Sequence, residues 1–173
     1  MSIPAAVGFI GVGTMGCPMA INLMAKGYPV IAFDVNAKAL DTVVKAGAVP
    51  AKSVQDVCNQ ARVVFTSLPS PAVFSEVMLG EGGIHAGSAV KIAVDLSTVG
   101  PRSTKAAAQG LHEKGIDLVD APVSGGPSGA HKGTLTVMAA GAQMAQDEVW
   151  PMLEVFGKVF TIGQEAGQAP VSY

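Results

Sequence analysis

A glycine-rich segment near the N-terminus has the spacing of a phosphate-binding turn. Residues 8–16 read Gly-Phe-Ile-Gly-Val-Gly-Thr-Met-Gly, and the last three glycines form the pattern G-x-G-x-x-G between an apolar run and a helix-length segment. The first glycine permits a tight turn, the second lets the backbone approach a pyrophosphate, and the third lets helix and strand pack closely. Backbone N–H groups at the start of the helix would face the anion. A glycine-rich turn without a ligand is the alternative. The residues expected to bind the phosphates of a dinucleotide are Gly11, Val12, Gly13, Thr14, Met15 and Gly16.

An acidic residue follows at the end of the next apolar run. Asp34 comes 18 residues after Gly16, close to the spacing of about 20 at which a carboxylate binds the ribose hydroxyls of NAD. The same carboxylate would repel the 2′-phosphate of NADP, and no arginine follows closely to bind it. We therefore favour NAD as the cofactor and keep NADP as possible. In the alternative interpretation Asp34 only ends a strand or caps the next helix together with Asn36.

A second segment has the composition of a carboxylate-binding loop. Ser124 offers a hydroxyl, and Gly125 and Gly126 leave their backbone N–H groups unshielded, an arrangement that suits a carboxylate. A flexible turn that joins two strands is the alternative. We predict that Ser124, Gly125 and Gly126 bind the acid group of a small substrate.

The elements that must position these residues alternate between strands and helices. Short runs rich in Val, Ile and Phe predict strands at Ala5–Ile10, Val30–Asp34, Val63–Leu68, Lys91–Ser97, Asp117–Val123, Thr134–Ala140 and Lys158–Ile162. Helix starts are expected at Asn36, Ser53, Ser70-Pro71 and Gly100-Pro101, and a further helix over Gln143–Phe156. The strands are apolar almost throughout, which is typical of a sheet covered on both faces. The sequence therefore predicts an α/β fold of the Rossmann type, doubly wound around a mostly parallel sheet.

Composition excludes several classes of protein. The chain has 173 residues, of which 14% are charged and 49% apolar, and its net charge is −2. This size fits one domain, or one domain and the start of another. Without a basic stripe a nucleic acid is not expected as a partner. The charged fraction is well below the usual figure of about 25%, which indicates that part of the surface is meant to be covered.

Cysteine content and the first residues predict a cytoplasmic location. Cys17 and Cys58 cannot build a disulfide framework and lack zinc-ligand spacing. Met1–Pro4 carries no basic segment, so we expect no cleaved signal. The uncharged stretch Ala5–Ala25 is long enough for a membrane span, but its clustered glycines favour a buried strand that turns into a helix. The three histidines are far apart in the sequence, so we predict no metal site.

Four motifs resemble those of a known family. They are Gly8–Ala20, Ser67-Leu68-Pro69, Asp95-Leu96-Ser97-Thr98 and Asp120–Ala130. The motifs resemble those of the β-hydroxyacid dehydrogenases, the group of 3-hydroxyisobutyrate dehydrogenase and tartronate semialdehyde reductase, with 6-phosphogluconate dehydrogenase as a more distant relative. The resemblance covers residues 1 to about 168. It implies that Leu68 and Pro69 lie beside the path of the cofactor and that Thr98 lies near the nicotinamide ribose, at the sheet edge where open α/β sheets bind ligands.

The resemblance also implies an activity and a domain organisation. The reaction would be reversible hydride transfer between NAD(P) and a short 3-hydroxy acid, of the 3-hydroxyisobutyrate or 2-hydroxy-3-oxopropionate type. Residues 1–163 would form the NAD(P)-binding domain, and residues 164–173 would be the truncated start of an interdomain segment. The family's all-helical second domain, which builds its homo-oligomer, would be missing. The partners implied are a small hydroxy acid or semialdehyde and a second copy of the full-length protein.

The chain departs from the family pattern near its C-terminus. In the family a catalytic lysine lies a few residues after a Gly-Gln-Ala segment; Gly167-Gln168-Ala169 is present here, but no lysine occurs after Lys158. Lys132 is expected in a solvated turn over residues 131–133, which suits a lysine base poorly. We therefore expect no catalytic residue in this chain and no activity from it alone. Three hypotheses stay open: the front of an active dehydrogenase, a non-catalytic dinucleotide-binding module or decaying remnant, and a methyltransferase with an adenosyl cofactor.

Overall fold

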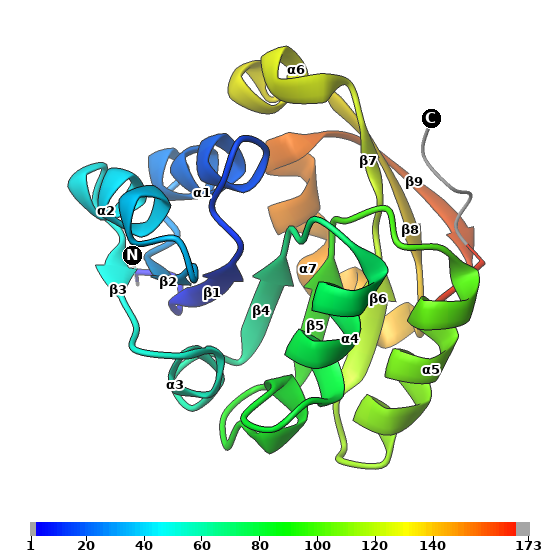
Figure 1. Cartoon of the computed structure of the whole chain (residues 1–173). Helices are drawn as coiled ribbons and strands as arrows, with labels where there is room; N and C mark the ends of the chain where they lie inside the picture. The colour runs from blue at the N-terminus through cyan, green and yellow to red at the C-terminus, as the bar shows by residue number, and fades with distance from the viewer. Residues whose placement is uncertain (1–2, 169–173) are drawn as a thin grey trace.

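A computed structural model describes residues 3–168 of the chain, so the predictions for residues 169–173 lie outside the described residues. Strands and helices alternate along most of the chain (Figure 1). The strands are β1 (Val7–Ile10), β2 (Val30–Phe33), β3 (Val49–Pro50), β4 (Val63–Thr66), β5 (Ile92–Asp95), β6 (Asp117–Asp120), β7 (Val123–Ser124), β8 (Leu135–Ala140) and β9 (Gly157–Gly163). The helices are α1 (Gly16–Ala25), α2 (Ala37–Lys45), α3 (Val54–Cys58), α4 (Pro71–Leu79), the 3₁₀ turn η1 (Ile84–Ala86), α5 (Pro101–His112), α6 (Gly126–Lys132) and α7 (Gln143–Phe156).

The sheet has the strand order of a Rossmann fold. Six strands lie side by side in the order β3-β2-β1-β4-β5-β6, all parallel. Phe9 of β1 lies between Ala32 of β2 and Phe65 of β4. The chain order reverses between β1 and β4, so the connections leave these strands toward opposite faces of the sheet. Such a reversal opens a crevice at the carboxyl ends of the two strands.

Two apolar layers cover the two faces of this sheet. One layer contains Phe9 and Phe65 from the strands, together with buried residues of α1, α2, α6 and α7. The other contains Val64 and Ala93 from the strands, together with buried residues of α3, α4 and α5. Alternate residues of a strand point to opposite faces, which is why neighbouring strand residues fall in different layers. The prediction of a doubly wound, mostly parallel sheet is confirmed.

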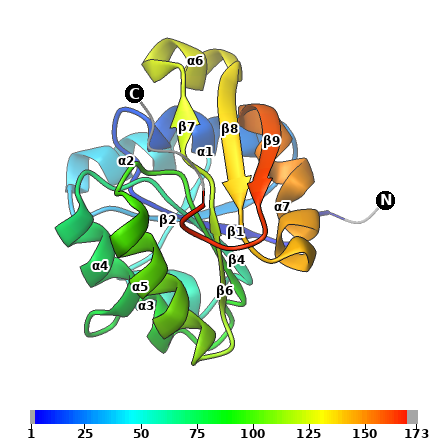
Figure 2. The same cartoon turned by 90° about the vertical axis from the view of Figure 1, so that its right-hand side faces the viewer.

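The part of the sheet beyond β6 differs from the prediction. The expected strand Asp117–Val123 is two strands, because the chain leaves the sheet at Ala121-Pro122 and returns as β7. Pro122 has no N–H to donate to a ladder. β8 runs antiparallel to β6 and β7 and parallel to β9. The strands β7, β8 and β9 lie side by side at one end of the molecule (Figure 2). The short edge strand β3 was not predicted, since it has only two residues and one is Pro50.

Local capping explains where the helices begin. The side chain of Asn36 accepts hydrogen bonds from the N–H groups of Lys38 and Ala39, Ser53 caps α3, and Ser70 caps α4. The predicted helix starts are therefore confirmed. In the turn expected at residues 131–133, His131 and Lys132 are exposed, but they form the last turn of α6, which ends at Lys132 and is followed by Gly133 in the left-handed conformation. Ala5–Ala25 contains β1 and α1, and no helix within residues 3–168 is long and apolar enough to cross a membrane.

Candidate functional site

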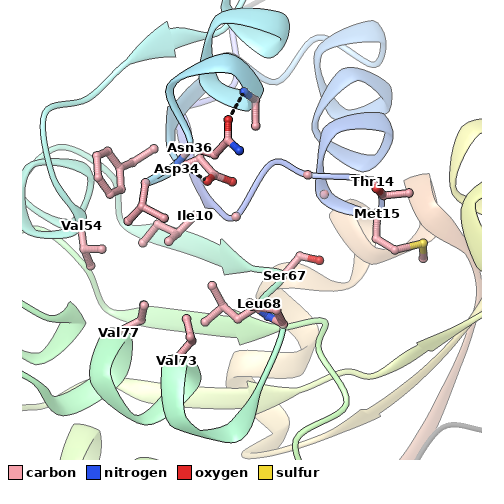
Figure 3. Close-up of a pocket in the computed structure, with 17 residues that line it drawn as sticks. Ile10, Thr14, Met15, Asp34, Asn36, Val54, Ser67, Leu68, Val73 and Val77 are labelled. Carbon is pink, nitrogen blue, oxygen red and sulfur yellow. Dashed lines mark hydrogen bonds between the residues drawn. The ribbon is translucent and has the colours of Figure 1, made fainter.

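A cavity of about 490 Å³ lies at the crevice between β1 and β4 (Figure 3). This volume is within the range of about 300–1,000 Å³ found for small-molecule sites. Its walls come from the glycine-rich turn, the end of β2, the loop after β4 and one side of α4. The residues predicted for cofactor binding that line it are Gly11, Gly13, Thr14, Met15, Gly16, Asp34, Leu68 and Pro69. The structure therefore brings together most of the predicted cofactor-binding residues.

The three glycines of the turn have different surroundings. Gly11 has φ +90°, and a Cβ atom there would collide with the carbonyl oxygen of Ser67. A Cβ atom on Gly16 would collide with the carbonyl oxygen of Gly11, because helix α1 starts directly against the turn. A Cβ atom on Gly13 would meet nothing within 4 Å. The backbone at Gly13 is thus open to the cavity, whereas the other two glycines are required by the protein's own packing.

Asp34 fastens the glycine-rich turn to the end of β2. One carboxylate oxygen, Oδ2, accepts a hydrogen bond of 2.8 Å from the N–H of Val12, and Oδ1 accepts one of 2.8 Å from the N–H of Asn36. The side chain is half-buried beside the cavity. Each carboxylate oxygen can accept more than one hydrogen bond, so Asp34 keeps acceptor capacity toward the cavity. Asp34 does more than end a strand, because it joins two segments that are 22 residues apart.

The opposite wall of the cavity is apolar. Four apolar side chains face Ile10 across the cavity (Figure 3): Val54 of α3, Leu68, and Val73 and Val77 of α4. The sequence analysis did not identify the three valines as site residues. The four-residue spacing of Val73 and Val77, just after the helix start at Ser70, was a usable signal that both lie on one side of α4. The wall offers a narrow apolar slot next to a polar turn.

Five predicted site residues do not line this cavity. Val12 is buried and takes part only through its N–H to Asp34. Thr98 is exposed beyond the end of β5. Ser124 ends β7, and Gly125 and Gly126 stand at the start of α6, which packs against α1 (Figure 1). None of these three residues lines the cavity. The positions of Thr98 and of residues 124–126 leave their predicted contacts with nicotinamide and substrate as predictions.

A buried polar cluster lies behind the loop after β4. Asp95 is fully buried, and its Oδ1 accepts hydrogen bonds from the hydroxyls of Thr66, at 2.8 Å, and Ser97, at 2.7 Å. Asp120 lies beside Asp95 on the neighbouring strand β6 and accepts a hydrogen bond of 3.2 Å from the N–H of Gly167. Burial raises the pKa of Asp95 to about 6, and burial together with the charge of Asp95 raises the pKa of Asp120 to about 7. The sequence analysis recorded these aspartates only as parts of motifs, because their burial cannot be read from the sequence.

The cysteines and Lys132 do not line the cavity. Both cysteines are free, and burial raises the pKa of the Cys17 thiol and raises that of Cys58 to about 12. Lys132 is exposed at the end of α6. Within residues 3–168 no group of three His, Cys, Asp or Glu side chains is placed to hold a metal ion.

Three features define a dinucleotide-binding domain of the Rossmann type. They are the parallel sheet whose strand order reverses between β1 and β4, the glycine-rich turn at this reversal, and the carboxylate of Asp34 at the end of β2. Residues 6–163 match the family model of the NAD binding domain of 6-phosphogluconate dehydrogenase. The chain belongs to the β-hydroxyacid dehydrogenase family, of which it represents the NAD(P)-binding domain.

Individual relatives support this assignment. The chain is 44% identical to 2-(hydroxymethyl)glutarate dehydrogenase of Eubacterium barkeri, over 94% of this chain and 55% of that protein. It is 38% identical to 2-hydroxy-3-oxopropionate reductase of Escherichia coli, over 90% of this chain and 53% of that protein. The solved structure of Mycobacterium tuberculosis 3-hydroxyisobutyrate dehydrogenase with L-serine superimposes with a TM-score of 0.89 at 30% identity, over 95% of this chain and 56% of that one. The chain thus spans about half the length of these relatives.

Proposed function

We propose that the chain binds NAD(P) in the cavity between β1 and β4 and is the cofactor-binding part of an oxidoreductase. The substrate pair would be a short 3-hydroxy acid and its semialdehyde, of the 3-hydroxyisobutyrate or 2-hydroxy-3-oxopropionate type, interconverted at the CH–OH group by reversible hydride transfer. Relatives named for such hydroxy acids support this choice. When bound, the nicotinamide ring of the cofactor supplies the acceptor or donor of a hydride. A cytoplasmic location and a homo-oligomer at full length belong to the same proposal.

The observation that carries the proposal is the open backbone at Gly13. Gly11 and Gly16 must be glycine for the turn to pack, but no contact within residues 3–168 requires glycine at residue 13. A ligand that comes within contact distance of the backbone does require it. No side chain caps the start of α1, and the unpaired N–H groups at a helix start favour a phosphate. Cys17 is not one of them, because its N–H donates to the carbonyl of Gly13 at 2.9 Å. The apolar slot formed by Val54, Val73 and Val77 suits the adenine ring.

We further propose that NAD is preferred over NADP. Asp34 lies beside the cavity with acceptor capacity left, and the arginine that would bind a 2′-phosphate is absent from residues 35–61 of the sequence. A related solved structure, Psf3, contains NADP⁺ and is 31% identical, over 95% of this chain and 58% of that one, with a TM-score of 0.88. NADP therefore stays as the second cofactor to be tested.

We assign residues 1–163 to the cofactor domain and residues 164–173 to the start of the segment that leads out of it. Thr98 would lie near the nicotinamide ribose, and Ser124, Gly125 and Gly126 would bind the substrate's acid group. Within the 173-residue chain no lysine follows Lys158, so the chain on its own is proposed to bind the cofactor without turnover. A non-catalytic dinucleotide-binding module that uses the same cavity between β1 and β4 is the second candidate function.

The test is a titration of the purified chain with NADH, NADPH and S-adenosylmethionine, followed by nicotinamide fluorescence or calorimetry. We expect NADH to bind more tightly than NADPH and S-adenosylmethionine not to bind. Absence of binding of both nicotinamide cofactors at millimolar concentration would contradict the proposal. Mixing the chain with NADH and a semialdehyde should give no loss of absorbance at 340 nm, and steady consumption would contradict the assignment of binding without turnover.

A further inference from the structure

The hydroxyl of Ser97 links a buried carboxylate to the cavity wall. Ser97 Oγ donates a hydrogen bond of 2.7 Å to Oδ1 of Asp95. The same oxygen accepts a hydrogen bond of 2.7 Å from the N–H of Leu68, 29 residues earlier in the chain. A serine hydroxyl has a single hydrogen. Because Asp95 takes that hydrogen, the lone pairs of Ser97 Oγ are left to face the N–H of Leu68.

Asp95 is itself held in one orientation. The hydroxyl of Thr66 donates to Oδ1 at 2.8 Å, and the N–H of Ser97 donates to the same atom at 3.2 Å. Thr66 and Asp95 are fully buried, and Ser97 is 8% exposed. A hydrogen-bonded group in such a dry environment is costly to leave without its partner. The hydrogen bonds from Thr66 through Asp95 and Ser97 to Leu68 therefore form one connected chain of interactions.

This chain of interactions reaches the cavity at Leu68, in the loop after β4, and this loop also contacts the glycine-rich turn. Leu68 lines the cavity directly. Its neighbour Ser67 donates its N–H to the carbonyl of Ile10 at 3.0 Å, and the carbonyl of Ser67 packs against Gly11. The loop after β4 thus sets the position of the glycine-rich turn from one side, as Asp34 does from the other. The two carboxylates hold the turn and the loop from opposite sides.

We propose that Asp95 and Ser97 are positioning residues of the dinucleotide site: Asp95 orients the hydroxyl of Ser97, which holds the Leu68 backbone in the conformation that binds the cofactor. This inference rests on the proposed function, since it assigns residues that act on the same cavity. Neither side chain lines the cavity, so neither is a catalytic residue.

The two carboxylate oxygens of Asp95 have different surroundings, and this difference predicts which substitution keeps its role. Oδ2 is buried and has no hydrogen-bond partner among the described residues, and Asp120 lies beside Asp95 across the β5–β6 register. Only Oδ1 accepts from Ser97 and Thr66. An asparagine at residue 95 could keep its carbonyl oxygen in the Oδ1 position and place its NH₂ group at the Oδ2 position. The inference therefore predicts that asparagine replaces Asp95 in this role and that alanine does not.

The experiment compares Asp95→Asn, Asp95→Ala, Ser97→Ala and the double variant Asp95→Ala/Ser97→Ala with the original chain. The measured quantities are the Kd for NADH and the thermal midpoint of the ligand-free protein. Ser88→Ala is the control, because Ser88 also hydrogen-bonds a side chain from an earlier loop, that of Asn59, away from the cavity. If Ser97→Ala does not fold, the comparison of Asp95→Asn with Asp95→Ala carries the test.

We expect Ser97→Ala and Asp95→Ala each to raise the Kd about fivefold or more, the range expected when one buried hydrogen bond is lost. Asp95→Asn should stay within about twofold of the original chain, on the same scale of hydrogen-bond energies. The double variant should be no worse than either single one, because both changes break the same connection. A lower thermal midpoint with unchanged Kd for Ser97→Ala would overturn the inference, as would equal Kd values for Asp95→Asn and Asp95→Ala.

A readout without ligand separates this inference from the proposed function. In ligand-free protein, hydrogen exchange of the Leu68 amide should be faster in Ser97→Ala than in the original chain and unchanged in Ser88→Ala. If the original chain bound no NADH, the proposed function would fail while this measurement could still confirm the link to Leu68. If NADH bound and Leu68 exchange did not change in Ser97→Ala, the inference alone would fail.

Discussion

Residues at the cavity edge fall into two groups: those held by contacts within the protein, and Gly13, which is open to a ligand. Gly11 and Gly16 are fixed by contacts with the protein's own carbonyl oxygens, and Asp34 is fixed by two backbone N–H groups. Gly13 has no such contact. A substitution at Gly11, Gly16 or Asp34 must change the ligand-free fold, whereas a substitution at Gly13 need not. This difference allows binding to be separated from folding by single changes.

Gly13→Ala should weaken cofactor binding and leave stability almost unchanged. The φ of Gly13 is not in the left-handed region and its Cβ position is empty, so alanine fits without strain. The added methyl group would prevent a phosphate from reaching the backbone, and we expect the Kd for NADH to rise roughly tenfold, which corresponds to the loss of one charge-assisted hydrogen bond. The check is an NADH titration together with a thermal melt.

Gly115→Ala is the control for that measurement. Gly115 has φ +76° in the turn before β6 and also has an empty Cβ position. Alanine there is strained, so the thermal midpoint should fall while the Kd stays the same. An unchanged Kd in Gly13→Ala would show that no ligand group approaches the turn at this residue.

Asp34→Ser should reduce the preference for NAD. Serine removes the charge that would repel a 2′-phosphate and the acceptor for ribose hydroxyls. It also removes the hydrogen bonds to Val12 and Asn36, so both cofactors should bind less well. We expect the ratio of the NADPH Kd to the NADH Kd to fall by roughly a factor of ten, on the scale of one lost interaction with a charged group. The measurement is paired titrations with the two cofactors, and an unchanged ratio would assign Asp34 to holding the turn alone.

At the scale of elements, the sequence predicted those whose signals are local. The parallel strands have continuous apolar runs, and the helix starts at Asn36, Ser53 and Ser70 are set by side chains within three residues. The predicted glycine turn and Asp34 lie at the cavity for the same reason. The division of β6 from β7 and the antiparallel pairing of β8 depend on partners far along the chain. The spacing of Val73 and Val77 indicates that both lie on one side of α4, but it does not show that Val54 of α3 lies with them at the cavity.

Asn22 illustrates a contact that joins distant elements. Its Nδ2 atom, on α1, donates hydrogen bonds to the carbonyls of Ala130, at 2.8 Å, and His131, at 3.4 Å, in the last turn of α6. These carbonyls would otherwise lack intrahelical partners. Asn22→Leu should lower the thermal midpoint by about 2–4 °C, equivalent to about 1 kcal/mol in a domain of this size. Amides of residues 126–132 should lose protection from hydrogen exchange.

The matched control for Asn22 is Thr42→Ala. Thr42 is exposed, and its hydroxyl bonds only to the carbonyl of Lys38 within α2. Its loss should leave the exchange of residues 126–132 unchanged. Equal protection of α6 in Asn22→Leu and in the original chain would show that the last turn of α6 is held by other contacts.

At the scale of the whole molecule, the sheet buries two carboxylates next to each other between its apolar layers. Asp95 and Asp120 occupy register-paired positions on β5 and β6. The opposing groups are the hydroxyls of Thr66 and Ser97 around Asp95 and the N–H of Gly167 beside Asp120. None of them is a cation, so two negative charges would face each other in a dry environment. The pair therefore favours the protonated form, and the pKa of Asp120 is raised to about 7.

Folding stability should consequently fall as the pH rises toward neutrality. In the unfolded chain both carboxyl groups ionise near pH 3.9, but in the folded protein the pair retains a proton up to about pH 7. The folded state binds more protons between these values, so the pair's contribution is fully present below about pH 4 and is lost as the pH rises through about 7. We expect this loss to be about 2–4 kcal/mol in the free energy of unfolding.

Asp120→Asn isolates this effect from the other titrating groups. The variant loses the titration of Asp120 but keeps that of Asp95, whose pKa is raised to about 6 by burial. Its free energy of unfolding should therefore fall less steeply than that of the original chain between pH 4 and 8. Urea unfolding at several pH values measures the difference between the two proteins, and Asp117→Asn, an exposed residue of the same strand, should show no such difference. Parallel pH curves for Asp120→Asn and the original chain would mean that Asp120 stays ionised in the folded protein.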